Sequence, residues 1–169
     1  DSGVAVITQS SNIMINLTMQ KRGLPIGYAV TVGNQAQLGL AELAMNIVQD
    51  KRVTALGLYV EGLGSIRNFE KLVSLCDQLG KAIVIIKIGK SEHAKVSAVS
   101  HTASLAGSDK GAAALMKRLG VARVDSLSEF IETLKIFHCH GRLLGASVAS
   151  VSCSGGEASL IADMSNGKQ

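Results

Sequence analysis

Short continuous apolar runs alternate along the chain with stretches in which apolar residues recur at helical spacing. The runs GVAVITQ, IGYAVTV, VTALGLYV and KAIVIIKIG are apolar and rich in β-branched residues, which favours strands. The expected strands are 3–9, 26–32, 53–60, 81–89 and 121–124. The expected helices are 10–22, closed by Gly23 and Pro25, and 39–50, 66–79, 108–119 and 126–137.

Five strand–helix units in strict alternation predict an α/β fold with a doubly wound, mainly parallel sheet. The composition supports this, because 47% of the residues are hydrophobic but only 3% are aromatic. Small and branched aliphatic residues are typical of a parallel sheet that helices cover on both faces. Such sheets bind ligands beyond the carboxyl ends of their strands. We therefore expect Ser10, Gly33, Glu61 and the segment 89–101 to meet at one edge.

The tail repeats the pattern of the first residues. VASVSCSGGEASLI resembles VAVITQSSNIMINL, and residues 145–164 again predict a strand, a serine and glycine turn, and a helix. We expect a first domain over residues 1–140. Residues 141–169 are expected to start a second, similar domain or to add one strand–helix unit. Because Asp1 leads straight into a strand, we interpret the chain as part of a longer polypeptide.

Charge and cysteine content exclude several classes of protein. The net charge is +4, but no basic run is longer than a pair, so we expect no nucleic-acid partner. No apolar run approaches the roughly 20 residues that span a bilayer, so we expect no membrane association. Cys76, Cys139 and Cys153 are scattered and odd in number, which favours a reducing compartment such as the cytoplasm.

The segment AVSHTASLAGSD places His101 among hydroxyls and small residues. An imidazole ionises near neutral pH and can serve as a nucleophile or as an acid or base. The alternative is a surface histidine in a polar loop. The helix expected from Ser108 favours the first interpretation, because backbone N–H groups at a helix start attract anions.

Two serine turns and one carboxylate are further candidates. Ser10 and Ser11 start a helix, either as a seat for a phosphate or as a simple N-cap. SCSGGE (152–157) forms a second such turn, whose glycines either admit a ligand or allow a tight turn. Glu61 ends an apolar strand, where it either accepts a hydrogen bond from an imidazole or is a solvated charge.

Two other motifs carry less weight. GLGSIR has Arg67 where a dinucleotide-binding fingerprint has its third glycine. In FHCHG, adjacent residues of a helix point in different directions, so His138, Cys139 and His140 are not expected to share a metal ion. We expect no metal site, and we expect His93 to be exposed.

The motifs GVAVITQSSN, TVGNQAQLGLAEL, LGLYVEG, IVIIKIGKS and SHTASLAGSD, in this order, resemble the flavodoxin-like domain of the NDP-forming acyl-CoA synthetases, relatives of the succinyl-CoA synthetase α subunit. The resemblance covers about residues 1–137. It implies a flavodoxin-like fold and the conversion of a carboxylic acid, CoA and NTP to acyl-CoA, NDP and phosphate, through an acyl phosphate and a phosphohistidine.

The resemblance also implies residue roles. His101 matches the phosphorylated histidine, and Glu61 matches the glutamate that orients it. Ser10, Ser11 and Asn12 match one helix start that binds the phosphoryl group. A second set of phosphate-binding residues is expected in the tail: Ser154, Gly155 and Gly156. Ser11 stands where the family has glycine.

Partners and cofactors follow from the same resemblance. The CoA-binding and ATP-grasp domains are expected elsewhere in the enzyme or in a partner subunit, within an oligomer. The chain itself is expected to bind no cofactor, whereas the full enzyme uses CoA and ATP with Mg²⁺. The alternative is a non-catalytic flavodoxin-like regulatory or interaction module. A flavin carrier is disfavoured, because few aromatic residues are present to sandwich a flavin.

Overall fold

The computed structural model describes residues 1–35, 37–91, 108–143, 145 and 149–166. The strands are β1 (Gly3–Thr8), β2 (Ile26–Thr31), β3 (Val53–Val60), β4 (Ala82–Lys87) and β5 (Ala122–Arg123). The helices are α1 (Ser11–Met19), α2 (Leu40–Ile47), α3 (Ile66–Gln78), α5 (Asp109–Leu119), α6 (Leu127–His140) and α7 (Gly155–Ser165). Each strand and helix expected between residues 3 and 137 is therefore present.

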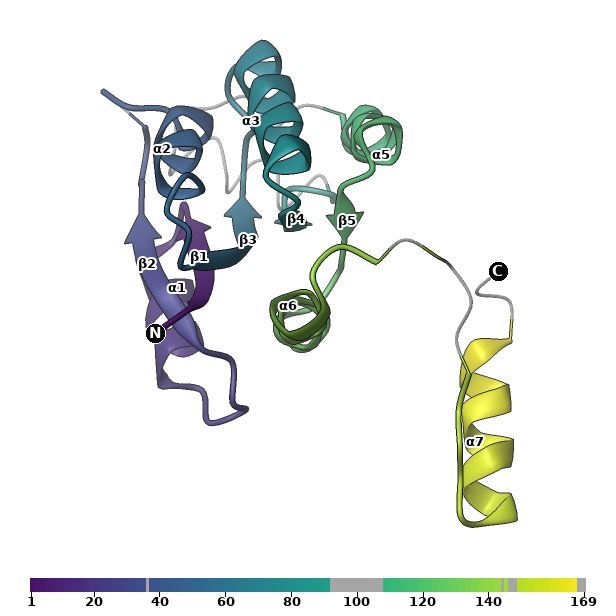
Figure 1. Ribbon diagram of the computed structural model, residues 1–169. Helices are drawn as coiled ribbons and strands as arrows, with labels where there is room; N and C mark the ends of the chain where they lie inside the picture. Colours follow the sequence, from purple (N-terminus) through teal and green to yellow (C-terminus); the bar gives the residue numbers. More distant parts are fainter. Residues whose placement is uncertain (36, 92–107, 144, 146–148, 167–169) are drawn as a thin grey trace.

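The five strands form one parallel sheet in the order β2-β1-β3-β4-β5 (Figure 1). This is the strand order of flavodoxin-like folds, in which the chain reverses its direction of growth between β1 and β3. The α/β, doubly wound, parallel fold predicted from the sequence is confirmed. Because the strands are parallel, the residues that follow β1, β3 and β4 lie at the same edge.

Helices cover both faces of the sheet. Figure 1 shows α2, α3 and α5 on one face and α1 and α6 on the other. Alternate residues of β4 serve the two layers: Ile83 and Ile85 pack with the first group, and Val84 and Ile86 pack with the second. A strand buried on both faces needs apolar residues at every position, which explains the continuous runs in the sequence.

Helix α1 is shorter than expected. It ends at Met19, and Gln20 is already extended, three residues before Gly23. The chain has to turn back at this point, because the Pro25 carbonyl accepts a hydrogen bond of 2.8 Å from the Val4 N–H and starts the pairing of β2 with β1. The pairing of β2 with β1 therefore ends α1 earlier than Gly23 and Pro25 in the sequence predict.

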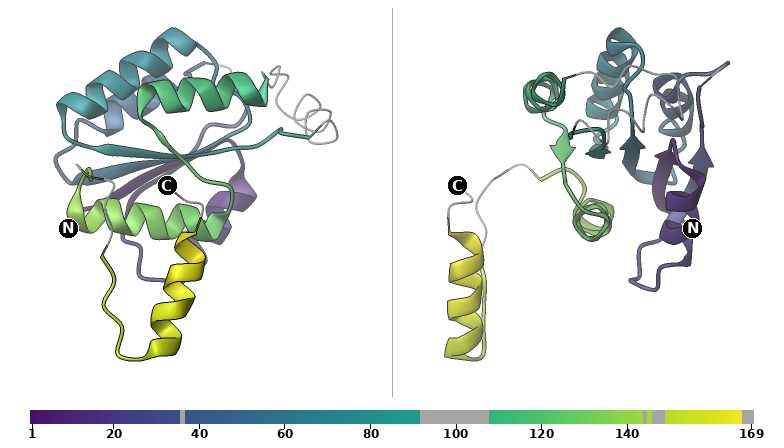
Figure 2. Two further views of the ribbon diagram at one scale, coloured as in Figure 1. Left: turned by 90° about the vertical axis from the view of Figure 1, so that its right-hand side faces the viewer. Right: turned by 180° about the vertical axis from the view of Figure 1, so that it is seen from behind.

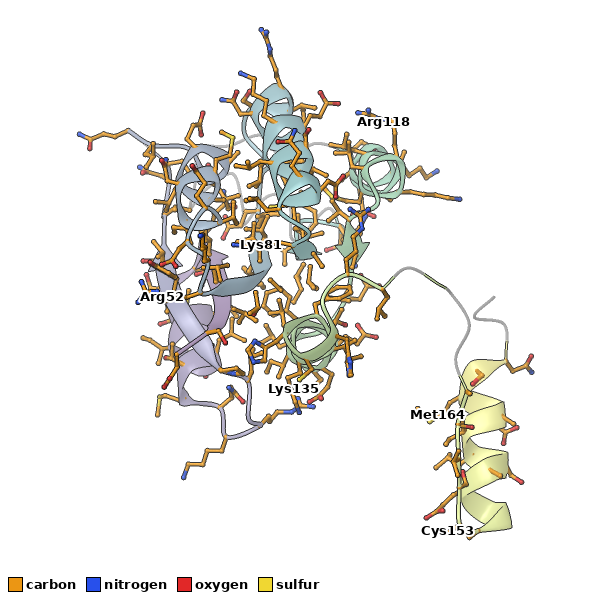
Figure 3. All side chains as sticks on the ribbon, viewed as in Figure 1. Arg52, Lys81, Arg118, Lys135, Cys153 and Met164 are labelled. Atoms are coloured by element: carbon orange, nitrogen blue, oxygen red, sulfur yellow. The ribbon has the colours of Figure 1, made fainter. Side chains whose placement is uncertain are left out.

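The tail contains the expected helix, α7, but residues 145 and 149–154 form no strand. No residue of α7 is buried, and Figures 1 and 2 show this helix standing away from the sheet. In Figure 3, Cys153 and Met164 mark its two ends, remote from the other labelled side chains. The division into a domain over 1–140 and a further unit over 141–169 stays a prediction. Within the described residues, no helix has both the length and the apolar character needed to cross a bilayer.

Candidate functional site

The carboxyl ends of β1 and β3 are joined by one buried side chain, Gln9. Its Oε1 accepts hydrogen bonds from the backbone N–H groups of Glu61 and Gly62, the second at 3.1 Å. Its Nε2 donates to the Gly62 carbonyl at 3.0 Å. Gln9 is only 6% exposed, so these bonds are shielded from water. The turn that begins at Glu61 is thereby fixed to the end of β1.

Glu61 is partly buried at this edge. Its Oε2 is buried and has no hydrogen-bond partner among the described residues. A buried carboxylate oxygen is normally hydrogen-bonded, because leaving it without a donor is costly. The nearby Tyr59 responds to the same carboxylate: the pKa of its phenol is raised, first by burial and then by the negative charge of Glu61. The edge therefore presents an acceptor that lacks a donor within the described part of the chain.

The serine turn at the start of α1 is also tied down. Ser10 is the N-cap, and its Oγ accepts a hydrogen bond of 3.4 Å from the Ile13 N–H. The hydroxyl of Thr8 donates to the Ser10 carbonyl at 2.7 Å. Ser11 and Asn12 are exposed in the first helical turn. The N-cap interpretation of Ser10 is confirmed, and binding of a phosphate by these residues stays a prediction.

A buried lysine lies at the end of β4. Lys87 is 2% exposed, and its Nζ donates to the Ile88 carbonyl at 2.5 Å. Burial lowers the pKa of its ammonium group, while the negative charge of Asp109 acts in the opposite direction. Asp109 begins α5 and forms an ion pair of 2.5 Å with Arg123, at the end of β5. Charged groups from three elements thus gather at this edge.

His101 lies outside the described residues, within the segment 92–107. The chain on both sides of that segment is attached to β5 or to the residues that follow it. On one side Lys90 forms an ion pair with Asp125, and on the other Asp109 pairs with Arg123. The described residues on either side of this segment, Lys90 and Asp109, therefore lie at the carboxyl edge of the sheet.

The second serine turn does not join this edge. Ser154 caps α7 through a reciprocal pair of bonds: its Oγ accepts from the Glu157 N–H at 3.2 Å, and its own N–H donates to Glu157 Oε2 at 3.3 Å. Gly155 and Gly156 are exposed, and a Cβ added to either would meet nothing within 4 Å. Through the hydrogen bonds of the adjacent Gln9, Ser10 and Glu61 lie at the same edge of the sheet. Helix α7, which Ser154 caps, stands away from the sheet (Figure 2).

The remaining histidines of the sequence motifs have other surroundings. His138 and His140 belong to α6, and the Nδ1 of His138 shares a hydrogen bond of 2.8 Å with the Thr54 hydroxyl. The described ranges contain no group of three or more side chains that could hold a metal ion. His93 lies in the segment 92–107, outside the described residues.

Gln9 and Lys87 were not among the site residues expected from the sequence. Each is a polar residue at the end of a run that is otherwise continuously apolar, GVAVITQ and KAIVIIK. A polar side chain at the carboxyl end of a buried parallel strand points to a ligand-binding edge or to a tie between loops. That signal was present in the sequence.

The fold and this edge define a flavodoxin-like α/β domain whose carboxyl edge carries a partly buried carboxylate, Glu61, and a buried lysine, Lys87. Comparison with known families is more specific. The sequence model of the succinyl-CoA ligase like flavodoxin domain matches residues 1–137. The chain belongs to this family.

Several relatives of this chain are ADP-forming CoA ligases or subunits of such ligases. The α subunit of acetate–CoA ligase (ADP-forming) I from Pyrococcus furiosus is 32% identical over 157 residues, which cover 90% of this chain and 33% of the relative. The 4-hydroxybutyrate–CoA ligase (ADP-forming) from Nitrosopumilus maritimus is 28% identical over 95% of this chain and 23% of the relative. The chain thus spans about a quarter to a third of the length of these relatives.

Solved structures agree with this placement. An acetyl-coenzyme A synthetase 1 from Candidatus Korarchaeum cryptofilum, in complex with phosphate and ADP, is 26% identical with a TM-score of 0.70. The match covers 82% of this chain and 30% of that chain. The apo form of the same enzyme superimposes with a TM-score of 0.81 over 98% of this chain and 36% of that one, at 24% identity, which shows the common fold.

Proposed function

We propose that this chain carries the phosphohistidine of an NDP-forming acyl-CoA synthetase, with His101 as the phosphorylated residue. Glu61 would orient the imidazole: its carboxylate accepts a hydrogen bond from one ring nitrogen, which leaves the lone pair of the other nitrogen free to attack phosphorus. The observation that supports this best is the buried Glu61 Oε2, which has no donor among the described residues. Lys90 and Asp109, the described residues on either side of the segment with His101, form ion pairs at the same edge.

The reaction consists of three transfers. The imidazole attacks the terminal phosphorus of NTP, the bond to the bridging oxygen breaks, and NDP leaves. The carboxylate of the acid then takes the phosphoryl group from the histidine to give an acyl phosphate. Finally the CoA thiolate attacks the acyl carbon and releases phosphate. Small residues and hydroxyls around His101 suit this sequence, because a phosphorylated ring carries about two negative charges and needs unobstructed donors.

The complete reaction requires more than this chain. A CoA-binding domain and an ATP-grasp domain would act with it, on the same polypeptide or on a partner subunit, in a cytoplasmic oligomer. CoA, ATP with Mg²⁺ and a carboxylic acid would be their ligands. The names of the relatives support this, since they are ADP-forming CoA ligases of which the chain covers only a part.

The Ser154 turn fits the same proposal as a second phosphate-binding site. In a flavodoxin-like second domain, α7 would acquire neighbours that cover its exposed apolar residues. Leu160 and Met164 are 59% and 61% exposed, so the helix has apolar surface available for such packing. The turn at Ser154 would then approach the carboxyl edge only in the assembled enzyme.

Labelling of the complete enzyme tests the proposal. Incubation with ATP labelled at the γ-phosphate is expected to give an acid-labile, base-stable phosphoenzyme. His101→Ala should abolish the label, and His93→Ala, in the same segment, should keep it. Glu61→Gln is expected to slow labelling without unfolding the domain. A label that persists in His101→Ala would overturn the assignment, and the absence of any label from the wild type would favour the non-catalytic module.

A further inference from the structure

Gln9 holds the backbone of Glu61 in place at the carboxyl ends of β1 and β3. Strands β1 and β3 are neighbours in the sheet, and their hydrogen bonding continues one step past β1, where the Gln9 N–H donates to the Tyr59 carbonyl at 3.1 Å. Beyond this point the two chains separate, since α1 starts at Ser11 and a loop follows Glu61. No backbone partner from β1 remains for the turn at residues 61 and 62.

The side chain of Gln9 supplies these missing partners. A primary amide has one oxygen that accepts two hydrogen bonds and one NH₂ group that donates. All three roles are used here, two by the N–H groups of Glu61 and Gly62 and one by the Gly62 carbonyl. A carboxylate of the same size lacks the donor, and an apolar side chain of the same size lacks all three interactions.

The position of the Glu61 carboxylate depends on this turn. The N–H of Glu61 is one of the three bonded groups, so Gln9 sets the backbone from which the carboxylate projects. Oxygen Oε2 is buried, which leaves the side chain little freedom to compensate for a displaced backbone. A misplacement of about 1 Å at a reacting group can cost on the order of 100-fold in rate.

We propose that Gln9 is a positioning residue for Glu61 and acts by fixing the backbone at residues 61 and 62 through its amide. This inference rests on the proposed function of Glu61. Gln9 touches neither substrate nor phosphoryl group in this account. It affects phosphorylation through Glu61 alone, and this is what separates it from a residue that merely stabilises the fold.

A double-mutant cycle on the rate of phosphoenzyme formation tests whether Gln9 acts through Glu61 or only stabilises the fold. In the complete enzyme, Gln9→Met should slow phosphorylation by about 10- to 100-fold, because the turn loses all three hydrogen bonds. In the Glu61→Gln background the same substitution should cost less than about threefold, because the carboxylate that Gln9 positions is already gone. A general loss of fold would slow both backgrounds equally.

Two further variants keep the test decisive. Gln9→Glu retains an oxygen acceptor for both N–H groups and is expected to fold, but it sets a carboxylate against the Gly62 carbonyl and should again slow phosphorylation only when Glu61 is present. Thr54→Val is the matched control, since it removes one hydrogen bond of 2.8 Å from the far half of β3. It should leave the rate within about twofold of the wild type.

The outcomes are distinct. Equal losses from the Gln9 substitutions in the two backgrounds, or no loss from either in the wild-type background, would overturn the positioning role. If Glu61→Gln itself phosphorylates at the wild-type rate, the proposed role of Glu61 fails instead, and that result is visible before any Gln9 variant is made.

Discussion

Helices α1 and α7 begin alike and end up in opposite surroundings. Each starts at a serine whose Oγ accepts a hydrogen bond from the N–H three residues later, Ile13 for α1 and Glu157 for α7. The cap of α7 is the more complete one, because the Glu157 side chain also bonds back to the Ser154 N–H. Yet α1 buries Met14 and Leu17, whereas α7 buries nothing.

The difference shows what a local sequence can and cannot specify. A serine cap and a helical run suffice to start a helix in both places. At α1, but not at α7, neighbouring residues tie the start of the helix to the edge of the sheet. Thr8 donates a hydrogen bond to the Ser10 carbonyl, and Gln9 donates one to the turn after β3. The edge of the sheet, and not the serine, provides the candidate site.

The largest contrast is expected from the same substitution in each helix. Leu17 is 1% exposed and Leu160 is 59% exposed. Leu17→Ala should lower the free energy of unfolding by about 2–5 kcal/mol, because it leaves a cavity between α1 and the sheet. In the chain of residues 1–169 on its own, Leu160→Ala should change it by less than about 0.5 kcal/mol. Urea unfolding followed by circular dichroism measures both changes in the free energy of unfolding. Equal losses would show that α7 packs on the domain expected over residues 1–140.

Removal of the two caps should give a smaller contrast. Ser10→Ala is expected to lower the free energy of global unfolding by about 1 kcal/mol, since the Ile13 N–H loses its acceptor. In the same chain, Ser154→Ala should leave the global unfolding transition unchanged, because no residue of α7 is buried. Thermal unfolding of the two variants decides this, and a shifted midpoint in Ser154→Ala would contradict the independence of α7.

The buried Lys87 predicts a pH-dependent effect. Burial lowers the pKa of its ammonium group in the folded protein relative to the usual 10.5, so the folded state bears a cost while the group is charged. Lys87→Met should raise the free energy of unfolding at pH 7, because an apolar side chain of similar size bears no cost of burying a charge. This gain should shrink as the pH rises toward 10.5, where the wild-type lysine loses its charge. Urea unfolding at pH 7 and pH 10 measures it, and a gain that grows with pH would contradict the effect of burial.

The smallest contrast concerns thiol reactivity. Cys76 is buried in α3, and burial raises the pKa of its thiol to about 12, whereas Cys153 is exposed just before α7. At pH 8 iodoacetamide should modify Cys153 within minutes and leave Cys76 unmodified until the sheet and the helices that cover it unfold. Mass spectrometry of the peptides reads out both, and rapid modification of Cys76 in the native protein would show that α3 opens.

Much of the fold was predictable because burial of a parallel sheet leaves a plain pattern. The run VTALGLYV coincides with β3, residue for residue, since six of the eight residues of that strand are buried and the other two are partly buried. The end of α1 was not predictable in this way, because the pairing of Pro25 with Val4 depends on contacts distant in the sequence. The predicted strand of the tail is absent from residues 145 and 149–154, which pair with none of the five described strands of the sheet.

The candidate site was predictable in part. Ser10 and Glu61 follow strands, so their meeting at one edge follows from parallel topology alone. The polar residue that ends the run GVAVITQ was a visible signal, but the partners of Gln9 at residues 61 and 62 were not predictable, because they depend on how the chain separates beyond β1 and β3. The Ser154 turn lies apart from this edge, and no residue of the helix that it caps is buried. Its proposed approach to the edge would require the assembled enzyme.

The most direct test of the account is to locate the phosphate on the phosphorylated enzyme. Tryptic digestion under alkaline conditions, where phosphohistidine survives, should release the peptide 96–110, in which His101 is the one histidine. The account predicts that fragmentation of this peptide places the phosphate on His101. Phosphate located on a serine, on Glu61, or on any peptide other than 96–110 would contradict it.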